Sequence, residues 1–261
     1  MSQASIGIFD SGVGGMSITR EIQSLLPKEQ LLYLADSKNA PYGPKGDAAI
    51  RALANKNTEI LLSKGCKMIV VACNTATTVA ISELRSTYKV PFIGIEPAIK
   101  PAALQSHSGV VGVLATRGTL ASSLFQNTSA LHASGITVVE QEGNGLVPLI
   151  EAAAFDSLEL KRLLSAYIAP MVEAQIDALV LGCTHYPYLK PLLNQLLPEH
   201  IQIIDSGMAV AKQTFRVLDE AGLLADQKVL DSEFYTNTDL DLLRKFMQIS
   251  GCSGKTSFLD F

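Results

Sequence analysis

The sequence predicts an α/β protein made of two similar open, mainly parallel-sheet units that face each other across a cleft with pseudo-twofold symmetry. Short runs rich in Val, Ile and Leu alternate with segments of helical spacing, which is typical of parallel strands covered by helices on both faces. Two of these runs, VVACNTATT at 70–78 and LVLGCTHYP at 179–187, meet a cysteine and then turn polar. Cys73 and Cys183 therefore lie at equivalent strand-to-helix junctions, where open sheets build binding crevices.

The first half of the chain is expected to form a βαβαβ unit with right-handed crossovers. Pro27 and Gly65 end two of its helices, and the segment DSKNAPYGPKG at 36–46 is too rich in Pro, Gly, Asn and Asp to be regular. The expected strands are 5–10, 30–35, 68–72 and 92–95, and the expected helices are 16–26, 47–64 and 76–85.

The second half repeats this order. If Gly7 is aligned with Gly112, 66 positions lead to Cys73 and 71 lead to Cys183. Each unit therefore places one cysteine at the mouth of the cleft. The expected strands are 110–115, 136–140, 178–182 and 201–204, and the expected helices are 144–151, 158–174 and 188–197.

The remaining tail is expected to return to the first unit, which otherwise has fewer covering helices. Helices are predicted at 208–221 and 239–248, with a short strand at 233–236 between them. The domains are thus expected to be 1–96 with 209–261, and 97–208.

Composition excludes several classes of protein. The 261 residues are 48% hydrophobic and 18% charged with a net charge of −4, which is typical of a soluble globular chain and gives no basic surface for nucleic acid. No apolar run is long enough to span a membrane, and the start lacks the pattern of a signal peptide. Four cysteines without C-x-x-C spacing indicate reduced thiols and a cytoplasmic location.

The four cysteines have different expected roles. A cysteine is most often a small buried apolar residue, and this interpretation is preferred for Cys66, just ahead of a strand. Cys252, in the polar sequence SGCSG, is expected to be a spectator thiol. Cys73 and Cys183 at matching junctions, each followed by hydroxyl or amide side chains, favour a functional pair.

Other motifs leave alternatives open. DSGVGG at 10–15 partly fits a dinucleotide fingerprint, but Ser17 stands at the third glycine position and Asp10 would repel a pyrophosphate. His185 is either a core histidine or a metal ligand, and the sequence offers no further ligand pair to support a metal. Tyr42 and Gly43 belong either to a turn or to a lid over the cleft.

Two thiols on opposite walls of a cleft suggest inversion of a stereocentre. A Cys–His–acid hydrolase needs one nucleophile, and a dithiol oxidoreductase normally carries both cysteines on one short segment. In a racemase, one thiolate removes a proton from carbon while the opposite thiol delivers one to the other face. Neither a pyridoxal-binding lysine nor a metal site is evident, so no cofactor is expected.

The thiols need help to ionise. Lowering a pKa from about 8.5 to about 7 requires roughly 2 kcal/mol, whereas a helix N-terminus typically supplies about 0.3–1 kcal/mol. Asp10 ends the strand beside that of Cys73, and His185 lies two residues after Cys183. We expect each to assist proton transfer at its neighbouring cysteine.

Five motifs carry a resemblance to a known family. FDSGVGG, ADSKNAPYGPKG, VVACNTATT, GIEPAIKPA and LVLGCTHYPYL, in this order between Ile6 and Gly207, resemble the glutamate racemases of the cofactor-independent aspartate/glutamate racemase superfamily. The sequence GCTHYP distinguishes these from aspartate racemases, in which Thr-Glu typically follows the second cysteine.

The resemblance implies that Cys73 and Cys183 are the acid/base pair, with Cys73 acting on D-glutamate, and that Glu151 is an acid near the second cysteine. It further implies a homodimer and a product, D-glutamate, that supplies peptidoglycan synthesis for the cell wall and cell shape. The implied substrate-binding residues are Asp10, Ser11, Tyr42, Gly43, Asn74, Thr75, Thr116, Thr119, Thr184 and His185.

Two other functions remain open: a related racemase or decarboxylase acting on another acid, and a binding protein whose cleft closes on an amino acid without turnover. About five residues precede the first strand, whereas activator-dependent members of the family have a longer extension there, so we expect no requirement for a wall-precursor activator.

Overall fold

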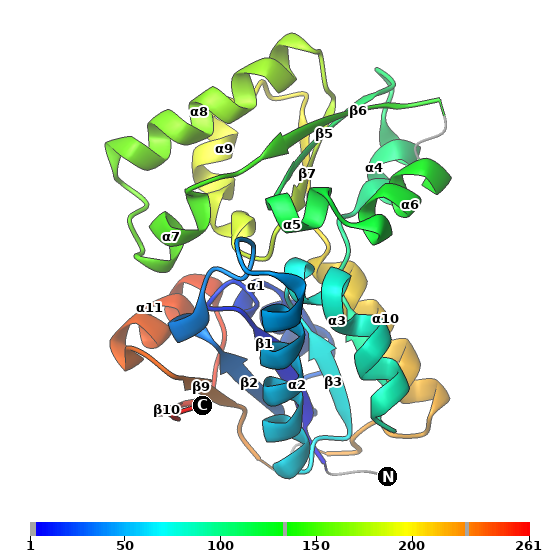
Figure 1. The fold of residues 1–261 in the computed structure, drawn as a ribbon, viewed down its shortest axis with the longest axis vertical. Helices are drawn as coiled ribbons and strands as arrows, with labels where there is room; N and C mark the ends of the chain where they lie inside the picture. The colour runs from blue at the N-terminus through cyan, green and yellow to red at the C-terminus, as the bar shows by residue number, and fades with distance from the viewer. Residues whose placement is uncertain (1–3, 133–134, 228–229) are drawn as a thin grey trace. The chain divides into compact units, whose positions relative to one another are not determined.

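The computed structural model describes residues 4–132, 135–227 and 230–261. Contacts within the chain divide it into two units, Met1–Ile95 with Gly207–Phe261, and Glu96–Ser206. Figure 1 labels their helices and strands along the chain. Each unit holds one sheet, and all neighbouring strands described in both sheets are parallel. The predicted fold class, α/β with two parallel-sheet units, is confirmed.

The sheet of the first unit has the strand order β10-β9-β2-β1-β3-β4. Its strands are β1 Ile6–Asp10, β2 Leu31–Ala35, β3 Met68–Val71, β4 Phe92–Gly94, β9 Glu233–Thr236 and β10 Lys255–Phe258. Its helices are α1 Met16–Leu25, α2 Asp47–Ser63, α3 Asn74–Thr87, α10 Gly207–Glu220 and α11 Leu240–Ser250.

Helices cover both faces of this sheet (Figure 1). The chain leaves β1 toward β2 through α1 and reaches β3, on the other side of β1, through α2, so right-handed crossovers put α1 and α2 on opposite faces. Helices α2 and α3 pack on alternate strand residues such as Leu34, Ile69 and Val71, while α10 and α11 pack beside α1. This double coverage explains why the strands read as continuous apolar runs.

The sheet of the second unit has the order β6-β5-β7-β8. Helices α4 and α6 pack against each other on one face over Val113 and Val180, and α8 contacts both β6 and α9. The strands are β5 Val110–Ala115, β6 Thr137–Glu142, β7 Ala178–Gly182 and β8 Gln202–Ile204. The helices are α4 Ile99–Gln105, α5 Arg117–Leu120, α6 Ser123–His132, α7 Leu146–Glu151, α8 Leu158–Glu173 and α9 Lys190–Leu196.

The internal repeat of the sequence has a structural counterpart. The order β2-β1-β3-β4 in one sheet matches β6-β5-β7-β8 in the other. The pairing register also matches, because Gly7 is paired with Ile69 and Gly112 with Leu179. Both cysteines therefore follow the strand at the same place in their sheets, next to the strand that begins each repeat.

Gly7 and Gly112 meet the same kind of neighbour. A Cβ atom at Gly7 would lie 3.0 Å from the Cys66 sulfur, and one at Gly112 would lie 2.8 Å from the Ile176 side chain. Such distances are shorter than ordinary contacts of a Cβ atom, so a larger residue at either position would displace a neighbouring side chain. Cys66 stands where the second unit has an isoleucine, which agrees with its expected role as a buried apolar residue.

Several predicted elements need correction. The helix expected at 76–85 begins at Asn74, directly after Cys73, while the helix expected at 188–197 is a 3-10 helix, η2 Tyr186–Leu189, followed by α9. The segment 36–46 contains a short 3-10 helix, η1 Ser37–Asn39, so it is not wholly irregular. The sequence interpretation also missed β10, α4, α5 and α6.

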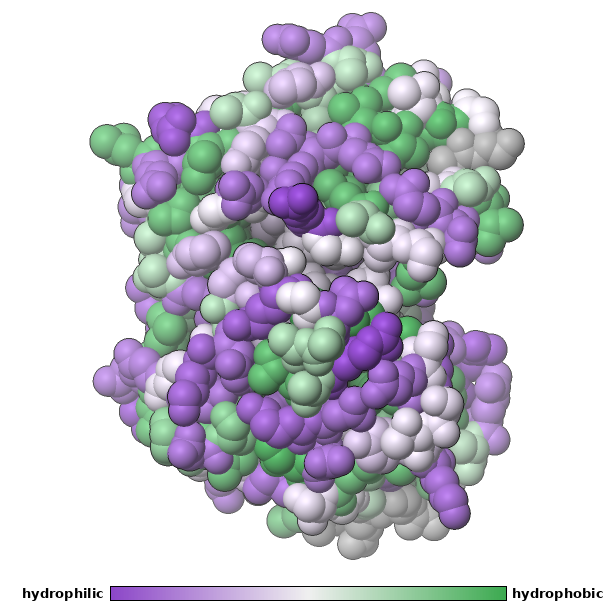
Figure 2. Space-filling model, viewed as in Figure 1, coloured by the Kyte–Doolittle hydropathy of each residue, from purple (hydrophilic) through white to green (hydrophobic). Residues whose placement is uncertain are grey.

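The surface is mixed in character. Figure 2 shows hydrophilic side chains (purple) interspersed with smaller apolar areas (green) on one face of the molecule. Large apolar side chains do reach the solvent in places, among them Leu104, Leu131 and Leu158. Among the described residues, no helix is both long and apolar enough to cross a membrane.

Asp177, just ahead of β7, anchors the turn that precedes β5. Its carboxylate accepts hydrogen bonds from the Ser106 hydroxyl (2.7 Å) and from the N–H groups of His107 (2.5 Å) and Ser108 (2.7 Å). Partial burial alone would raise the pKa of Asp177, but these hydrogen bonds, led by Ser108, lower it to about 2 from the ordinary 3.8. The resulting stabilisation is present above pH 3.8 and is lost as the pH falls toward 2.

We expect Asp177→Asn to lower the free energy of unfolding at pH 7 by about 1–2 kcal/mol, because a partly exposed carboxylate loses charge-assisted hydrogen bonds. Urea unfolding at pH 7 and pH 3 measures the effect, which should shrink at pH 3. Asp156→Asn, at an exposed position in the same unit, is the control and should stay within about 0.5 kcal/mol of the parent. An equal loss at both pH values would contradict the assignment.

Candidate functional site

Cys73 is placed by β3 and α3 of the first unit. It is the N-cap residue of α3, and its sulfur accepts the N–H of Ala76 at 3.4 Å. The side chain is buried, with the residue 4% exposed. A helix N-terminus favours negative charge by about 0.3–1 kcal/mol, and up to about 2 kcal/mol where partly buried, which offsets part of the cost of burying a thiolate here.

Asp10 ends the neighbouring strand β1 and Ser11 follows it, so both lie at the same sheet edge. The N–H of Ala72 donates to the Phe9 carbonyl at 2.9 Å, which sets the two strand ends side by side. The Ser11 hydroxyl oxygen then lies 3.7 Å from the Cys73 sulfur. Asp10 is fully buried, and one of its carboxylate oxygens accepts the N–H groups of Gly12 and Gly15, each at 3.1 Å.

The glycines of DSGVGG serve this loop. A Cβ atom at Gly15 would lie 2.7 Å from the Asp10 Cβ, so a larger residue would displace the carboxylate from the N–H groups that hold it. The motif therefore folds around its own aspartate. This local role accounts for Gly15 without a dinucleotide.

Asn74, the first residue of α3, has an unusual environment. It is 3% exposed, yet neither polar atom of its amide has a hydrogen-bond partner among the described residues. A buried amide left unpaired costs about 1–3 kcal/mol, so native proteins rarely keep one without a purpose. The amide beside Cys73 is thus suited to bind a polar ligand. Thr75, the next residue, is also buried.

Tyr42 lies near Cys73 but does not offer its hydroxyl to a ligand. That hydroxyl donates to Asp36 at 2.6 Å and accepts the Asn57 amide at 3.1 Å. Burial first, then the negative charges of Asp36 and Cys73, raise the pKa of Tyr42, so the hydroxyl stays protonated. Within the described chain, no group accepts the backbone N–H of Tyr42 or Gly43. A ligand would therefore meet this loop through its N–H groups.

In the second unit, Cys183 follows β7 and belongs to a chain of three side chains. Its sulfur lies 3.8 Å from Nδ1 of His185, and Nε2 of His185 lies 2.5 Å from Oε1 of Glu151. Cys183 and His185 are buried at 6% and 1% exposure. Glu151, the last residue of α7, therefore orients the imidazole toward the thiol, an arrangement suited to proton transfer.

The threonines of the second unit surround the same sheet edge. Thr116, directly after β5, is the N-cap of α5, and its hydroxyl lies 2.9 Å from that of Thr119. Thr184, next to Cys183, is buried. Tyr186 is fully buried, and its hydroxyl donates to the Gly143 carbonyl at 3.2 Å. Burial, and then negative charge at Cys183, raises the pKa of Tyr186.

The structure thus gathers every predicted site residue of the first unit near Cys73 and those of the second unit near Cys183. Sequence reasoning missed Asp36 and Asn57, whose side chains hydrogen-bond to the Tyr42 hydroxyl. The only sequence signal for either residue is a polar side chain among apolar neighbours.

The other two cysteines are expected to stay protonated. Burial raises the pKa of Cys66 to about 12 and that of Cys252 to about 11, which keeps both as thiols. Among the described residues, no group of three or more His, Cys, Asp or Glu is placed to hold a metal ion.

Sequence comparison places this arrangement in a family. The family model of Asp/Glu/Hydantoin racemases matches residues 6–214. The chain belongs to the Asp/Glu/hydantoin racemase family. It is accordingly an isomerase, an amino-acid racemase, as the five motifs of the sequence predict.

Close relatives are glutamate racemases. That of Ectopseudomonas mendocina (strain ymp) is 47% identical over 249 residues, which cover 95% of each chain. That of Pseudomonas entomophila (strain L48) is 47% identical over 245 residues, covering 94% of this chain and 92% of the relative.

Solved structures agree. A glutamate racemase isoform from Bacillus anthracis has a TM-score of 0.89 at 29% identity, covering 99% of this chain and 98% of that chain. Escherichia coli glutamate racemase, solved with L-glutamate and the activator UDP-MurNAc-ala, has a TM-score of 0.86 at 33% identity and 98% coverage of both chains. This chain matches nearly the whole length of a racemase that was solved with an activator. That the protein described here works without an activator therefore stays a prediction.

We expect Asn74→Leu to raise the free energy of unfolding by about 1 kcal/mol, because it removes an unpaired buried amide, and to lower racemase activity at least about tenfold. Thermal unfolding and turnover of glutamate measure the two effects.

Thr77→Val is the matched control, because the Thr77 hydroxyl is fully paired with the Val71 carbonyl and the Ile95 N–H, each at 3.1 Å. It should destabilise the protein. A destabilised Asn74→Leu variant that keeps its activity would show that the amide has no ligand role.

Proposed function

We propose that the protein interconverts L-glutamate and D-glutamate by a two-base reaction at Cα, with Cys73 and Cys183 as the acid/base pair and no cofactor. The observation that carries the proposal is the equivalent placement of the two thiols, each buried at the carboxyl end of the same strand of its sheet. The identity of the close relatives supports glutamate as substrate.

The proposed reaction conserves protons and electrons. One cysteine enters as thiolate and takes the Cα proton, so the C–H bond breaks and its electron pair delocalises into the substrate carboxylate. The other cysteine enters as thiol and gives its proton to the opposite face of Cα. The enzyme is left with the roles of its two sulfurs exchanged, ready for the reverse direction.

Different groups assist the two thiols in this proposal. His185, oriented by Glu151, exchanges a proton with Cys183, which matches their 3.8 Å and 2.5 Å separations. Cys73 has the α3 N-terminus and Ser11 instead, with the Asp10 carboxylate at the adjoining strand end. In this proposal the α3 N-terminus stabilises a thiolate at Cys73, and the Asp10 carboxylate and the His185 imidazole act in proton transfer.

Substrate binding in this proposal uses hydrogen bonds rather than a paired cation. The unpaired Asn74 amide and the N–H groups of Tyr42 and Gly43 are suited to carboxylate oxygens, as is the start of α3. The remaining proposed contacts are Asp10, Ser11, Thr75, Thr116, Thr119, Thr184 and His185.

The biological role follows from the product. We propose that D-glutamate made in the cytoplasm supplies peptidoglycan synthesis, and that the enzyme works as a homodimer without nucleic-acid or membrane partners. A second candidate function is racemisation of another acid. A substrate panel distinguishes it from glutamate racemisation, because a glutamate racemase should turn over D-glutamate and not D-aspartate. A binding protein without turnover would keep its function in both cysteine variants.

We expect Cys73→Ser and Cys183→Ser each to lower racemisation by about 10²–10⁴-fold, because each removes one acid/base group. Each variant should still eliminate a leaving group from a suitable glutamate analogue, but from one enantiomer only, and the two variants should prefer opposite enantiomers. Circular dichroism in D₂O, with deuterium incorporation at Cα, follows both reactions.

Cys252→Ala is the control and should keep parental activity, since this thiol lies outside the proposed pair. A single cysteine variant that racemises at the parental rate would contradict the two-base mechanism.

A further inference from the structure

A buried carboxylate lies beneath the loop that presents Tyr42 and Gly43. Asp36, directly after β2, is fully buried. Its oxygens accept three side-chain hydrogen bonds, from Tyr42 at 2.6 Å, Asn39 at 2.8 Å and Asn237 at 2.6 Å. In the part of the chain that the structure describes, no Lys or Arg pairs with it. Neutral donors alone therefore stabilise this buried group, and each one matters.

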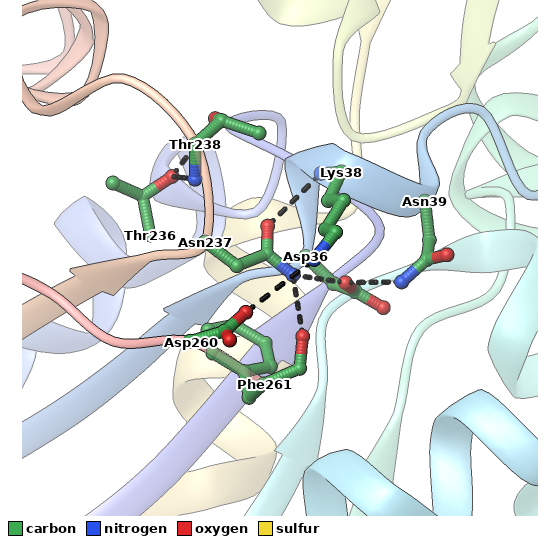
Figure 3. Close-up of polar contacts among 8 residues, drawn as sticks. All are labelled: Asp36, Lys38, Asn39, Thr236, Asn237, Thr238, Asp260 and Phe261. Atoms are coloured by element: carbon green, nitrogen blue, oxygen red, sulfur yellow. Dashed lines mark hydrogen bonds and ion pairs between the residues drawn. The ribbon is translucent and has the colours of Figure 1, made fainter.

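Asn237 is the donor that comes from far away in the sequence. It directly follows β9 and is 5% exposed. Figure 3 shows its amide between three segments: its nitrogen donates to Asp36 and, at 3.1 Å, to the Phe261 carbonyl, while its oxygen accepts the Lys38 N–H at 2.9 Å. Both N–H donors and the oxygen of this amide are hydrogen-bonded, so its orientation is fixed.

The segment 259–261 completes the arrangement. The Leu259 N–H donates to the Thr236 carbonyl at 3.0 Å, and Leu259 and Phe261 pack against the core cluster that contains Tyr42 and Cys73. The Lys56 ammonium lies 5.5 Å from the centroid of the Phe261 ring. The end of β9 and segment 259–261 are thus joined to the base of the loop 36–46.

We propose that Asn237 is a positioning residue that holds the Tyr42–Gly43 loop in its ligand-binding conformation through Asp36. The Asn237 amide holds one carboxylate oxygen of Asp36, and the other oxygen of Asp36 accepts the Tyr42 hydroxyl. The Tyr42 side chain in turn fixes the position of the unpaired backbone N–H groups of Tyr42 and Gly43. The catalytic consequence rests on the proposed function, in which these N–H groups bind a glutamate carboxylate. Asn237 itself touches neither substrate nor reacting atoms.

We assign to this loop the side-chain carboxylate of glutamate, whose charge does not change when the Cα proton is removed, so the loop should act equally on ground state and transition state. Loosening it therefore weakens substrate binding without slowing the chemical step. Loss of Asn237 should raise KM and leave kcat nearly unchanged. A general loss of folded protein would instead lower the amount of active enzyme and leave KM unaltered.

The test compares Asn237→Ala with the parent by hydrogen–deuterium exchange of the 36–46 peptides and by steady-state kinetics with both glutamate enantiomers. We expect exchange in this loop to become at least about tenfold faster and KM to rise about tenfold for both enantiomers, with kcat within about threefold. Asn39→Ala, which removes one donor from the same Asp36 oxygen and leaves β9 intact, should change both quantities in the same direction by less. It keeps the test decisive if Asn237→Ala does not fold.

Thr238→Ala is the matched control. Thr238 is exposed and adjacent to Asn237, and its hydroxyl contacts only Thr236, 3.2 Å away, among the groups drawn in Figure 3. Its exchange and KM should stay within about twofold of the parent. Unchanged loop exchange in Asn237→Ala and Asn39→Ala would overturn the inference, as would a fall in kcat at constant KM. Failure of the parent enzyme to racemise glutamate would overturn the proposed function instead, and the exchange data would still decide whether Asn237 holds the loop.

Discussion

The parallel pairing of β1 with β3, and of β5 with β7, is the constraint on which both cysteine sites depend. Parallel strands end at one edge of their sheet, so residues that follow neighbouring strands meet there. Asp10 and Ser11 thereby reach Cys73, and Thr116 lies on the strand end beside that of Cys183. Gly7 and Gly112 suit this packing, since a Cβ atom at either position would crowd a neighbouring side chain. A change of register would separate Cys73 from Ser11 and Cys183 from Thr116.

The two units repeat a backbone but differ in chemistry. At the 110-residue offset that relates the cysteines, Thr75 corresponds to His185 and Asn74 to Thr184. The Cys183 site therefore contains an imidazole that Glu151 orients, whereas the Cys73 site contains the α3 N-terminus and a carboxylate, Asp10, at the neighbouring strand end. A racemase needs one base on each face of a carbon but does not need identical bases. Divergence of a repeated unit can satisfy that requirement.

Much of this could be predicted from the sequence, because it follows from local pattern. Apolar runs gave the central strands to within a residue or two, and the polar residues after Cys73 and Cys183 marked the sheet edge. The pattern failed at β10, whose residues Lys255–Phe258 are mostly exposed and owe their strand form to pairing with β9. It also failed at α4, where Pro101 in the first turn masks the helix.

The supporting contacts lay beyond sequence reasoning for a different reason. Asp36 and Asn237 are 201 positions apart, and neither shows a local signal of the other. The sequence predicts that Tyr42 belongs to a turn or a lid and, from the resemblance, binds substrate, but nothing near it in the sequence shows that its hydroxyl is committed to Asp36 and Asn57 in the fold. Long-range hydrogen bonds depend on the tertiary fold and not on spacing along the chain.

The most direct test of the two-base proposal is a crystal structure of the enzyme with D-glutamate bound at the site. The proposal predicts that the sulfur atoms of Cys73 and Cys183 lie on opposite sides of the substrate Cα, each about 3–4 Å from it, as near-attack geometry requires. Two sulfurs on the same side of Cα, or one sulfur separated from the substrate by packed side chains, would contradict it.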